Sequence, residues 1–95
     1  MMIPQKYDMK QVRKEILSIL IDKYSKGIHD FSFRSRTVNR TLHHDPRIIG
    51  RSLLFLSREG LVEMVTNGPH NPKLWRTKFE NNPKFSAEKK AILKK

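Results

Sequence analysis

The spacing of apolar residues predicts a first helix near the start of the chain. From Met9 they recur every three or four positions until Gly27, where a helix is expected to stop. Asp8 can cap this helix with Gln11 as its capping-box partner, after a lead-in over residues 1–8 in which Pro4 disfavours helix. The expected inward residues are Met9, Val12, Ile16, Ile19, Leu20 and Tyr24.

The next residues predict an extended segment and a second helix. Residues 28–33 (IHDFSF) alternate, with both phenylalanines on one side, which suits a short edge strand or an extended connector. A helix capped by Ser32 or Ser35 should then run to about His44, with Val38, Thr41 and Leu42 facing inward. The connection to the following helix is short enough to be a tight turn between two packed helices.

The stretch Asp45–Gly60 carries the clearest helical pattern in the chain. Asp45 suits the N-cap, Pro46 suits the first helical position and Gly60 suits the stop. The helix should place its core residues and its arginines on opposite sides. The core face comprises Ile49, Ser52, Leu53 and Leu56, and the opposite side carries Arg47, Arg51 and Arg58.

Alternating residues after Gly60 predict two strands, Leu61–Thr66 and Leu74–Phe79, joined by the polar loop Asn67–Lys73. Within the second strand, Trp75 should point into the core with Thr77 and Phe79. Residues 80–95 should form a basic tail, either frayed or partly folded into a short helix capped by Ser86.

This order of elements, with the motif DPRIIGRSLLFLSREGLVEMV, resembles the winged helix-turn-helix family of DNA-binding domains over residues 9–79. Leu42, Ile49, Leu53, Leu56 and the exit Gly60-Leu61-Val62 match positions in MarR-like and ArsR-like transcription regulators. Small, basic winged helices of archaea and their viruses are also similar. The resemblance implies an α+β fold, a three-helix core with a C-terminal β-hairpin wing. Asn39 departs from the usual small apolar residue, and the long dimerisation helices of MarR-like proteins are lacking, which leaves monomer and homodimer both open.

Composition favours an anionic partner. The chain has 95 residues and a formal net charge of +11, which suits nucleic acid first and an acidic membrane surface second. Cysteine is absent, which fits a reducing compartment, and no apolar run is long enough for a membrane span. We expect a cytoplasmic, nucleoid-associated protein.

Arginine and lysine occupy different parts of the chain. Six of the eight arginines lie between Arg34 and Arg58, whereas no lysine occurs between Gly27 and Pro72. Because arginine can hold a guanine edge or a phosphate with two hydrogen bonds, the middle of the chain should carry the contacts to double-stranded DNA. We expect helix 45–60 to enter the major groove, with base contacts from Arg47, Gly50 and Arg51. Phosphate contacts are expected from Arg34, Ser35, Arg36, Thr37, Arg40 and Arg58.

The resemblance further implies a wing, residues 67–76, that lies on the minor groove or the flanking backbone through His70, Lys73 and Arg76. The function expected is that of a transcriptional regulator. Leu54 and Phe55 do not fit the core face of helix 45–60, so a partner could cover them. They support the alternative of a winged-helix protein-interaction module, within a replication or transcription assembly, that has only non-specific affinity for nucleic acid.

The sequence does not favour an enzyme or a cofactor protein. It contains no Gly-rich phosphate loop, nucleophile elbow or paired carboxylates in a plausible site, and it points to no small-molecule substrate. His43, His44 and Asp45 form the one cluster of metal-ligand types, but neighbouring helical residues project about 100° apart, so a shared metal is disfavoured. We expect no catalytic residue, metal or cofactor.

Overall fold

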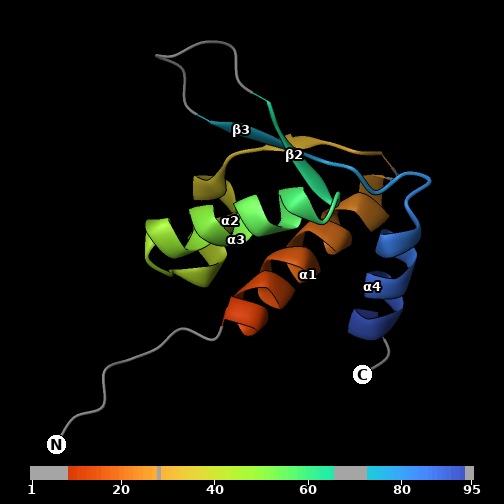
Figure 1. Ribbon diagram of the computed structural model, residues 1–95, viewed down its shortest axis with the longest axis horizontal. Coiled ribbons are helices and arrows are strands. Elements are labelled where there is room, and N and C mark those ends of the chain that lie inside the picture. Colours follow the sequence, from red (N-terminus) through yellow and green to blue (C-terminus); the bar gives the residue numbers. More distant parts are fainter. Residues whose placement is uncertain (1–8, 28, 66–72, 94–95) are drawn as a thin grey trace, which may run out of the picture.

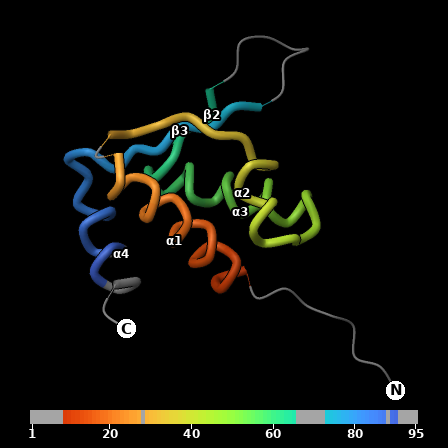
Figure 2. Tube along the Cα trace, turned by 180° about the vertical axis from the view of Figure 1, so that it is seen from behind, coloured from red at the N-terminus to blue at the C-terminus, as the bar shows by residue number. Residues whose placement is uncertain are grey.

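The protein is a small α+β domain in which helices pack against one side of an antiparallel sheet (Figures 1 and 2). The computed structural model describes residues 9–27, 29–65 and 73–93. Over these ranges it contains the helices α1 (Met9–Gly27), α2 (Ser35–Leu42), α3 (Pro46–Arg58) and α4 (Pro83–Leu93), and the strands β1 (Ser32–Phe33), β2 (Val62–Val65) and β3 (Leu74–Thr77). The lead-in 1–8 and the loop residues 66–72, which include His70, lie outside the described residues.

The sheet has the strand order β1-β3-β2, with both pairs antiparallel. The extended segment predicted over 28–33 therefore contributes a strand at the sheet edge, limited to Ser32–Phe33. Trp75 and Thr77 are buried and Arg76 is exposed, as the alternation along β3 requires. Trp75 and Thr77 thus face the helices, as predicted, and Arg76 lies on the opposite face of the sheet.

More of the surface of α1 is buried than the sequence pattern predicts. Val12, Ile16 and Leu20 are buried as expected, but Leu17 and Ile21 are buried too. The reason is that α1 packs against α2, α3 and α4, so more than one side of it is covered. On α2, Val38 is buried and Leu42 packs against the core, whereas the inward position predicted for Thr41 is wrong because its side chain is exposed.

The turn between α2 and α3 is held by an asparagine that the resemblance did not lead us to expect. The Asn39 side chain accepts a hydrogen bond from the His44 N–H and donates one to the His44 carbonyl, both at 2.7 Å. His43, with φ 59°, ends α2 in the left-handed conformation. The half-buried His44 ring lies 2.9 Å from a Glu15 carboxylate oxygen on α1. Asn39 therefore satisfies the backbone of the turn, which a small apolar residue could not do.

Both ends of α3 follow the sequence prediction. The Asp45 carboxylate accepts a hydrogen bond from the Arg47 N–H at 2.9 Å, and Pro46 opens the helix. After the last turn Gly60 takes φ 81°, while the N–H groups of Gly60 and Leu61 donate to the carbonyls of Ser57 and Leu56. This is the Schellman arrangement, which glycine adopts without steric penalty.

The helix caps predicted from serines are wrong at two places. Arg34, rather than Ser32 or Ser35, precedes α2, and its side chain forms no capping hydrogen bond. The helix in the predicted tail begins at Pro83, and the Asn82 side chain accepts from the Lys84 N–H at 2.9 Å, so Ser86 is not its cap. Asn82 also donates to the carbonyls of Gly60 and Lys78, which fixes the start of α4 beside the end of α3.

Two contacts join the end of β3 to the rest of the fold. Phe79 stacks on Phe85 of α4, with ring centroids 4.4 Å apart, and both side chains are buried. The Asp30 carboxylate accepts hydrogen bonds from the Thr77 hydroxyl and the Phe79 N–H, each at 2.8 Å. The predicted tail therefore supplies part of the core, and the segment before β1 is tied to the residues after β3.

Candidate nucleic-acid interface

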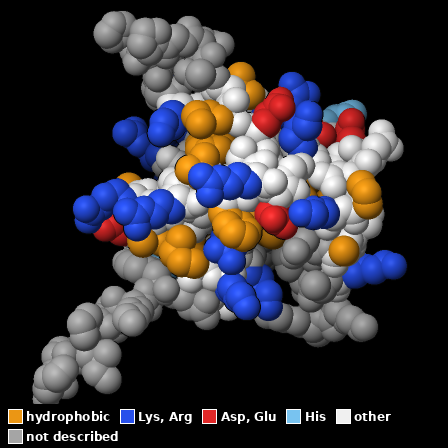
Figure 3. Space-filling model, in the orientation of Figure 1, with side chains coloured by type: hydrophobic (Ala, Val, Ile, Leu, Met, Phe, Trp, Pro, Cys, Tyr) orange, Lys and Arg blue, Asp and Glu red, His pale blue; other side chains and the backbone are white. Residues whose placement is uncertain are grey.

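The outward face of α3 carries cationic side chains directly opposite the core. Ile49, Ser52, Leu53 and Leu56 are buried, as predicted. Arg47, Arg51, Leu54 and Arg58 follow one another at helical spacings of four, three and four residues and are all exposed. The helix therefore presents one row of three arginines, with a leucine inside that row, to the surroundings. Figure 3 shows Lys and Arg side chains spread among hydrophobic ones over the side of the molecule on which α3 lies.

An open hollow lies between this face of α3, the start of α2 and the sheet. The residues that line it are Ser35, Pro46, Arg47, Gly50, Arg51, Leu54, Met64, Lys73 and Trp75. The fold thus gathers in one place all three predicted base-contact residues, one predicted phosphate contact and the wing residue Lys73. These residues come from three separate parts of the chain.

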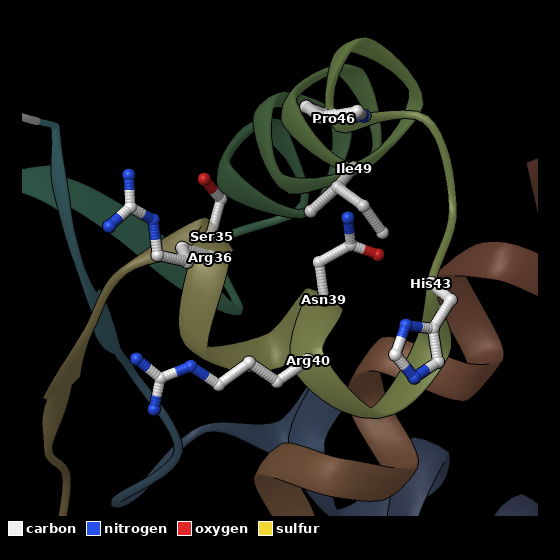
Figure 4. A pocket seen from close by; sticks show the side chains of 7 residues that line it. All are labelled: Ser35, Arg36, Asn39, Arg40, His43, Pro46 and Ile49. Carbon is white, nitrogen blue, oxygen red and sulfur yellow. The ribbon is translucent and has the colours of Figure 1, made fainter.

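A second hollow lies between α2 and α3 and shares Ser35 and Pro46 with the first. It is lined by Ser35, Arg36, Asn39, Arg40, His43, Pro46 and Ile49. Figure 4 shows Asn39 and Ile49 facing each other across it, while the guanidinium groups of Arg36 and Arg40 extend from α2 away from that pair. The two hollows meet at Ser35 and Pro46, the first residues of α2 and α3, and the second extends along α2 as far as His43.

Among the described residues, the Asp45 carboxylate is the one that pairs with an arginine of this surface. Arg47 Nη2 lies 3.0 Å from Asp45 Oδ2, and Arg47 Nε is 3.4 Å from Asp45 Oδ1. The side-chain hydrogen bond from Arg47 is the main cause that lowers the pKa of Asp45, and the hydrogen bond from the Arg47 N–H adds to it. The side-chain hydrogen bond also raises the pKa of Arg47. Arg47 is therefore held against its own helix cap.

The other arginines of α2 and α3 have no such partner. Arg34, Arg36, Arg40, Arg51 and Arg58 are exposed and form no ion pair with any residue in the described part of the chain. Asp45 is the one acidic residue between Phe31 and Arg58, so the sequence itself leaves these charges uncompensated. We call the surface formed by Arg34, Arg36, Arg40, Arg47, Arg51 and Arg58 the cationic face.

Gly50 lies on the outward side of α3 without a structural need for glycine. A Cβ atom built on it would meet no protein atom within 4 Å. Glycine in the interior of a helix costs roughly 0.5 to 1 kcal/mol relative to alanine. The fold alone would therefore favour alanine here, whereas close approach of another molecule would favour glycine.

Some predicted residues lie apart from the two hollows. Arg34, Thr37 and Arg58 are exposed but line neither of them. Arg76 points away from Trp75, which lines the first hollow, so the fold does not bring Arg76 to α3. His70 falls among the residues that the structure does not describe.

Three large apolar side chains are exposed on the described surface, and the sequence pattern predicted two of them. Leu54 and Phe55 are 40% and 41% exposed, in agreement with their poor fit to the core pattern. Met64, also 41% exposed, was not singled out, because its position beside α3 depends on the pairing of β2 with β3. The guanidinium carbon of Arg13 lies 3.8 Å from the centroid of the Phe55 ring, which partly covers that ring.

Comparisons with protein-family models, with curated proteins and with solved structures find no significant match to this chain. Within residues 9–27, 29–65 and 73–93, no three His, Asp or Glu side chains are grouped as metal ligands. None of the helices in those ranges combines the length and the apolar character that crossing a bilayer requires. The cationic face is therefore the feature from which function can be inferred.

Proposed function

We propose that this protein is a winged-helix transcriptional regulator that binds double-stranded DNA. In this proposal α3 enters the major groove, where Arg47 and Arg51 meet base edges and Gly50 allows close approach. The β2–β3 hairpin acts as the wing and lies along the adjacent minor groove or backbone, with Lys73 as its contact. The protein occupies promoter DNA in the cytoplasm.

The observation that carries this proposal is the row of arginines on the outward face of α3. Arg51 and Arg58 are exposed and have no ion pair within the described residues. Both lie on α3, whose opposite side is buried in the core. A major groove admits one α-helix, and arginine is the side chain most often used there to recognise guanine. The order of helices and strands, with a short turn between α2 and α3, supports the winged-helix assignment.

The residues of α2 suit contacts to phosphate. Arg36 and Arg40 extend from this helix beside the hollow that adjoins α3 (Figure 4). The N-terminus of α2 has no side-chain cap, so its positive end is open to an anion near Ser35. We therefore assign Arg34, Ser35, Arg36, Thr37, Arg40 and Arg58 to the sugar-phosphate backbone, which positions the protein without reading sequence. Arg76 is left out because it faces the other side of the sheet.

A second candidate function is that of a protein-interaction module with loose affinity for nucleic acid. The specific observation in its favour is the exposure of Leu54, Phe55 and Met64. A partner protein that covered these residues would remove apolar surface from water. The two functions differ in sequence dependence, because loose electrostatic binding does not distinguish one duplex from another.

Selection of bound fragments from random duplex DNA tests the proposal. The proposed regulator should enrich a motif and bind it on the order of a thousandfold more tightly than a scrambled duplex, with affinity that falls steeply as salt rises. Sedimentation of the complex gives the number of chains per site and separates monomer from homodimer. Failure to enrich any motif, together with salt-dependent binding to every duplex, would favour the interaction module.

A further inference from the structure

Leu54 occupies an unusual position for an exposed leucine. It follows Arg51 by three residues and Arg47 by seven, so it lies within the row of arginines rather than at the border of the core. It lines the first hollow together with Gly50, Arg51, Met64 and Lys73. The 40% exposed leucine and the 41% exposed Met64 thus make an apolar spot with cations around it.

The chemistry of the major groove restricts what this spot can contact. Base pairs present hydrogen-bond donors and acceptors there, and the one apolar group is the 5-methyl of thymine. Three residues of helix rise by about 4.5 Å, compared with about 3.4 Å for one base-pair step. A helix that holds a guanine through Arg51 therefore brings Leu54 within one or two base pairs of it.

We propose that Leu54 determines part of the sequence specificity by packing against the 5-methyl group of a thymine next to the guanine held by Arg51. This inference rests on the proposed function and adds to it the composition of the target: a guanine with a thymine one or two base pairs away. Any 5-methylpyrimidine offers the same apolar group at that position. A cytosine methylated at C5 should therefore recover part of the contact that unmethylated cytosine lacks.

The surrounding charges favour DNA over a protein as the molecule that covers Leu54. A protein partner that reached Leu54 would have to remove water from Arg47 and Arg51 on the same row, which is costly unless acids are supplied to both. A duplex provides acceptors for these arginines and a methyl group for the leucine on the same groove wall. A duplex can thus contact the arginines and Leu54 at the same time.

The test uses the full chain and the duplex that selection enriches. Each thymine is replaced in turn by deoxyuridine, which removes one methyl group and leaves the hydrogen-bonding edge unchanged, and affinity is measured by fluorescence anisotropy. At one thymine near the Arg51-dependent guanine, the wild type should lose about fourfold, the factor that corresponds to burial of one methyl group. Leu54→Ala should bind the thymine and uracil duplexes equally.

Phe55→Ala is the matched control, since Phe55 follows Leu54 on the same helix with nearly the same exposure but lies against Arg13. This variant should keep the wild-type ratio between thymine and uracil. If no thymine of the selected site shows a methyl effect, or if Leu54→Ala retains it, the inference is wrong although DNA binding stands. If Leu54→Ala leaves DNA binding unchanged and alters self-association instead, a second copy covers this residue and the inference is wrong. If selection enriches no motif, the proposed function itself is wrong, which is a different result from a missing methyl effect.

Discussion

The cationic face and the surface formed by the sheet and α4 use positive charge in different ways. Near the sheet and α4, two lysines lie beside carboxylates: Lys78 is 3.5 Å from Glu63, and Lys84 is 2.9 Å from Glu59. On the cationic face, the described residues provide a carboxylate only to Arg47, from Asp45. Exposed ion pairs contribute little to stability, so the difference concerns availability more than folding. The arginines of α2 and α3 keep their charge available for an external anion.

The strongest test of this difference removes three charges from the cationic face and, in a second variant, three lysines elsewhere that each have a carboxylate partner. Replacement of Arg34, Arg36 and Arg40 by glutamine should lower the salt slope of DNA affinity by about three units, because each lost phosphate contact removes nearly one. Replacement of Lys26, Lys78 and Lys84 by glutamine is the matched control, with the same change in net charge and a carboxylate partner beside each lysine. Anisotropy titrations at several salt concentrations measure both slopes. Equal losses in the two variants would mean that total charge, and not the cationic face, drives binding.

Gly50→Ala should affect stability and binding in opposite directions. The added methyl group meets no protein atom, so the variant should gain roughly 0.5 to 1 kcal/mol in the free energy of unfolding. It should also weaken binding to the selected duplex by about tenfold if α3 approaches the bases closely. Chemical denaturation and anisotropy measure the two effects. If the variant is more stable but its affinity is unchanged, the bases do not lie close to Gly50.

Asp45→Asn separates the cap of α3 from its charge. Asparagine is also a good N-cap, so the helix should keep its start, while Arg47 loses the carboxylate that holds it. The variant should bind the selected duplex a few times more tightly, whereas Asp45→Ala should also lower the melting temperature. An affinity that falls in Asp45→Asn would indicate that the carboxylate itself contacts DNA.

The lowered pKa of Asp45 gives this pair a defined dependence on pH. Because the pKa is lower in the folded than in the unfolded chain, the contribution of Asp45 to stability is complete above the ordinary value near 3.9 and disappears as pH falls through the folded value. Thermal melts in acid should therefore show a smaller loss of stability for Asp45→Asn than for the wild type. Parallel losses in the two proteins would contradict this.

The helix at the centre of the candidate site was predictable because its signals are local. Asp45, Pro46 and Gly60 mark its ends, and the separation of core residues from arginines follows from helical spacing alone. The ion pair between Asp45 and Arg47 was not predicted, although the two residues are close in sequence. A carboxylate at a cap with an arginine two positions later was the available signal.

The features that were missed depend on contacts between distant parts of the chain. Asp30 accepts hydrogen bonds from Thr77 and Phe79, which lie nearly fifty positions away in the sequence. Met64 lines the hollow beside α3 only because of the register of the sheet. Asn82 is an exception, because an asparagine directly before a proline is a local signal for a helix start, whereas the prediction placed the cap at Ser86. Leu17 and Ile21 are buried because other helices cover α1 from several sides, which periodicity does not reveal.

The most direct measurement of the central claim is the ratio of affinities for the selected and scrambled duplexes in Arg51→Ala. The variant should lose about 1 to 3 kcal/mol on the selected duplex and change little on the scrambled one, because Arg51 reads a base. Arg76→Ala, which removes an arginine from the far face of the sheet, should keep the wild-type ratio. Equal losses on both duplexes for Arg51→Ala would show that α3 attracts DNA without reading it.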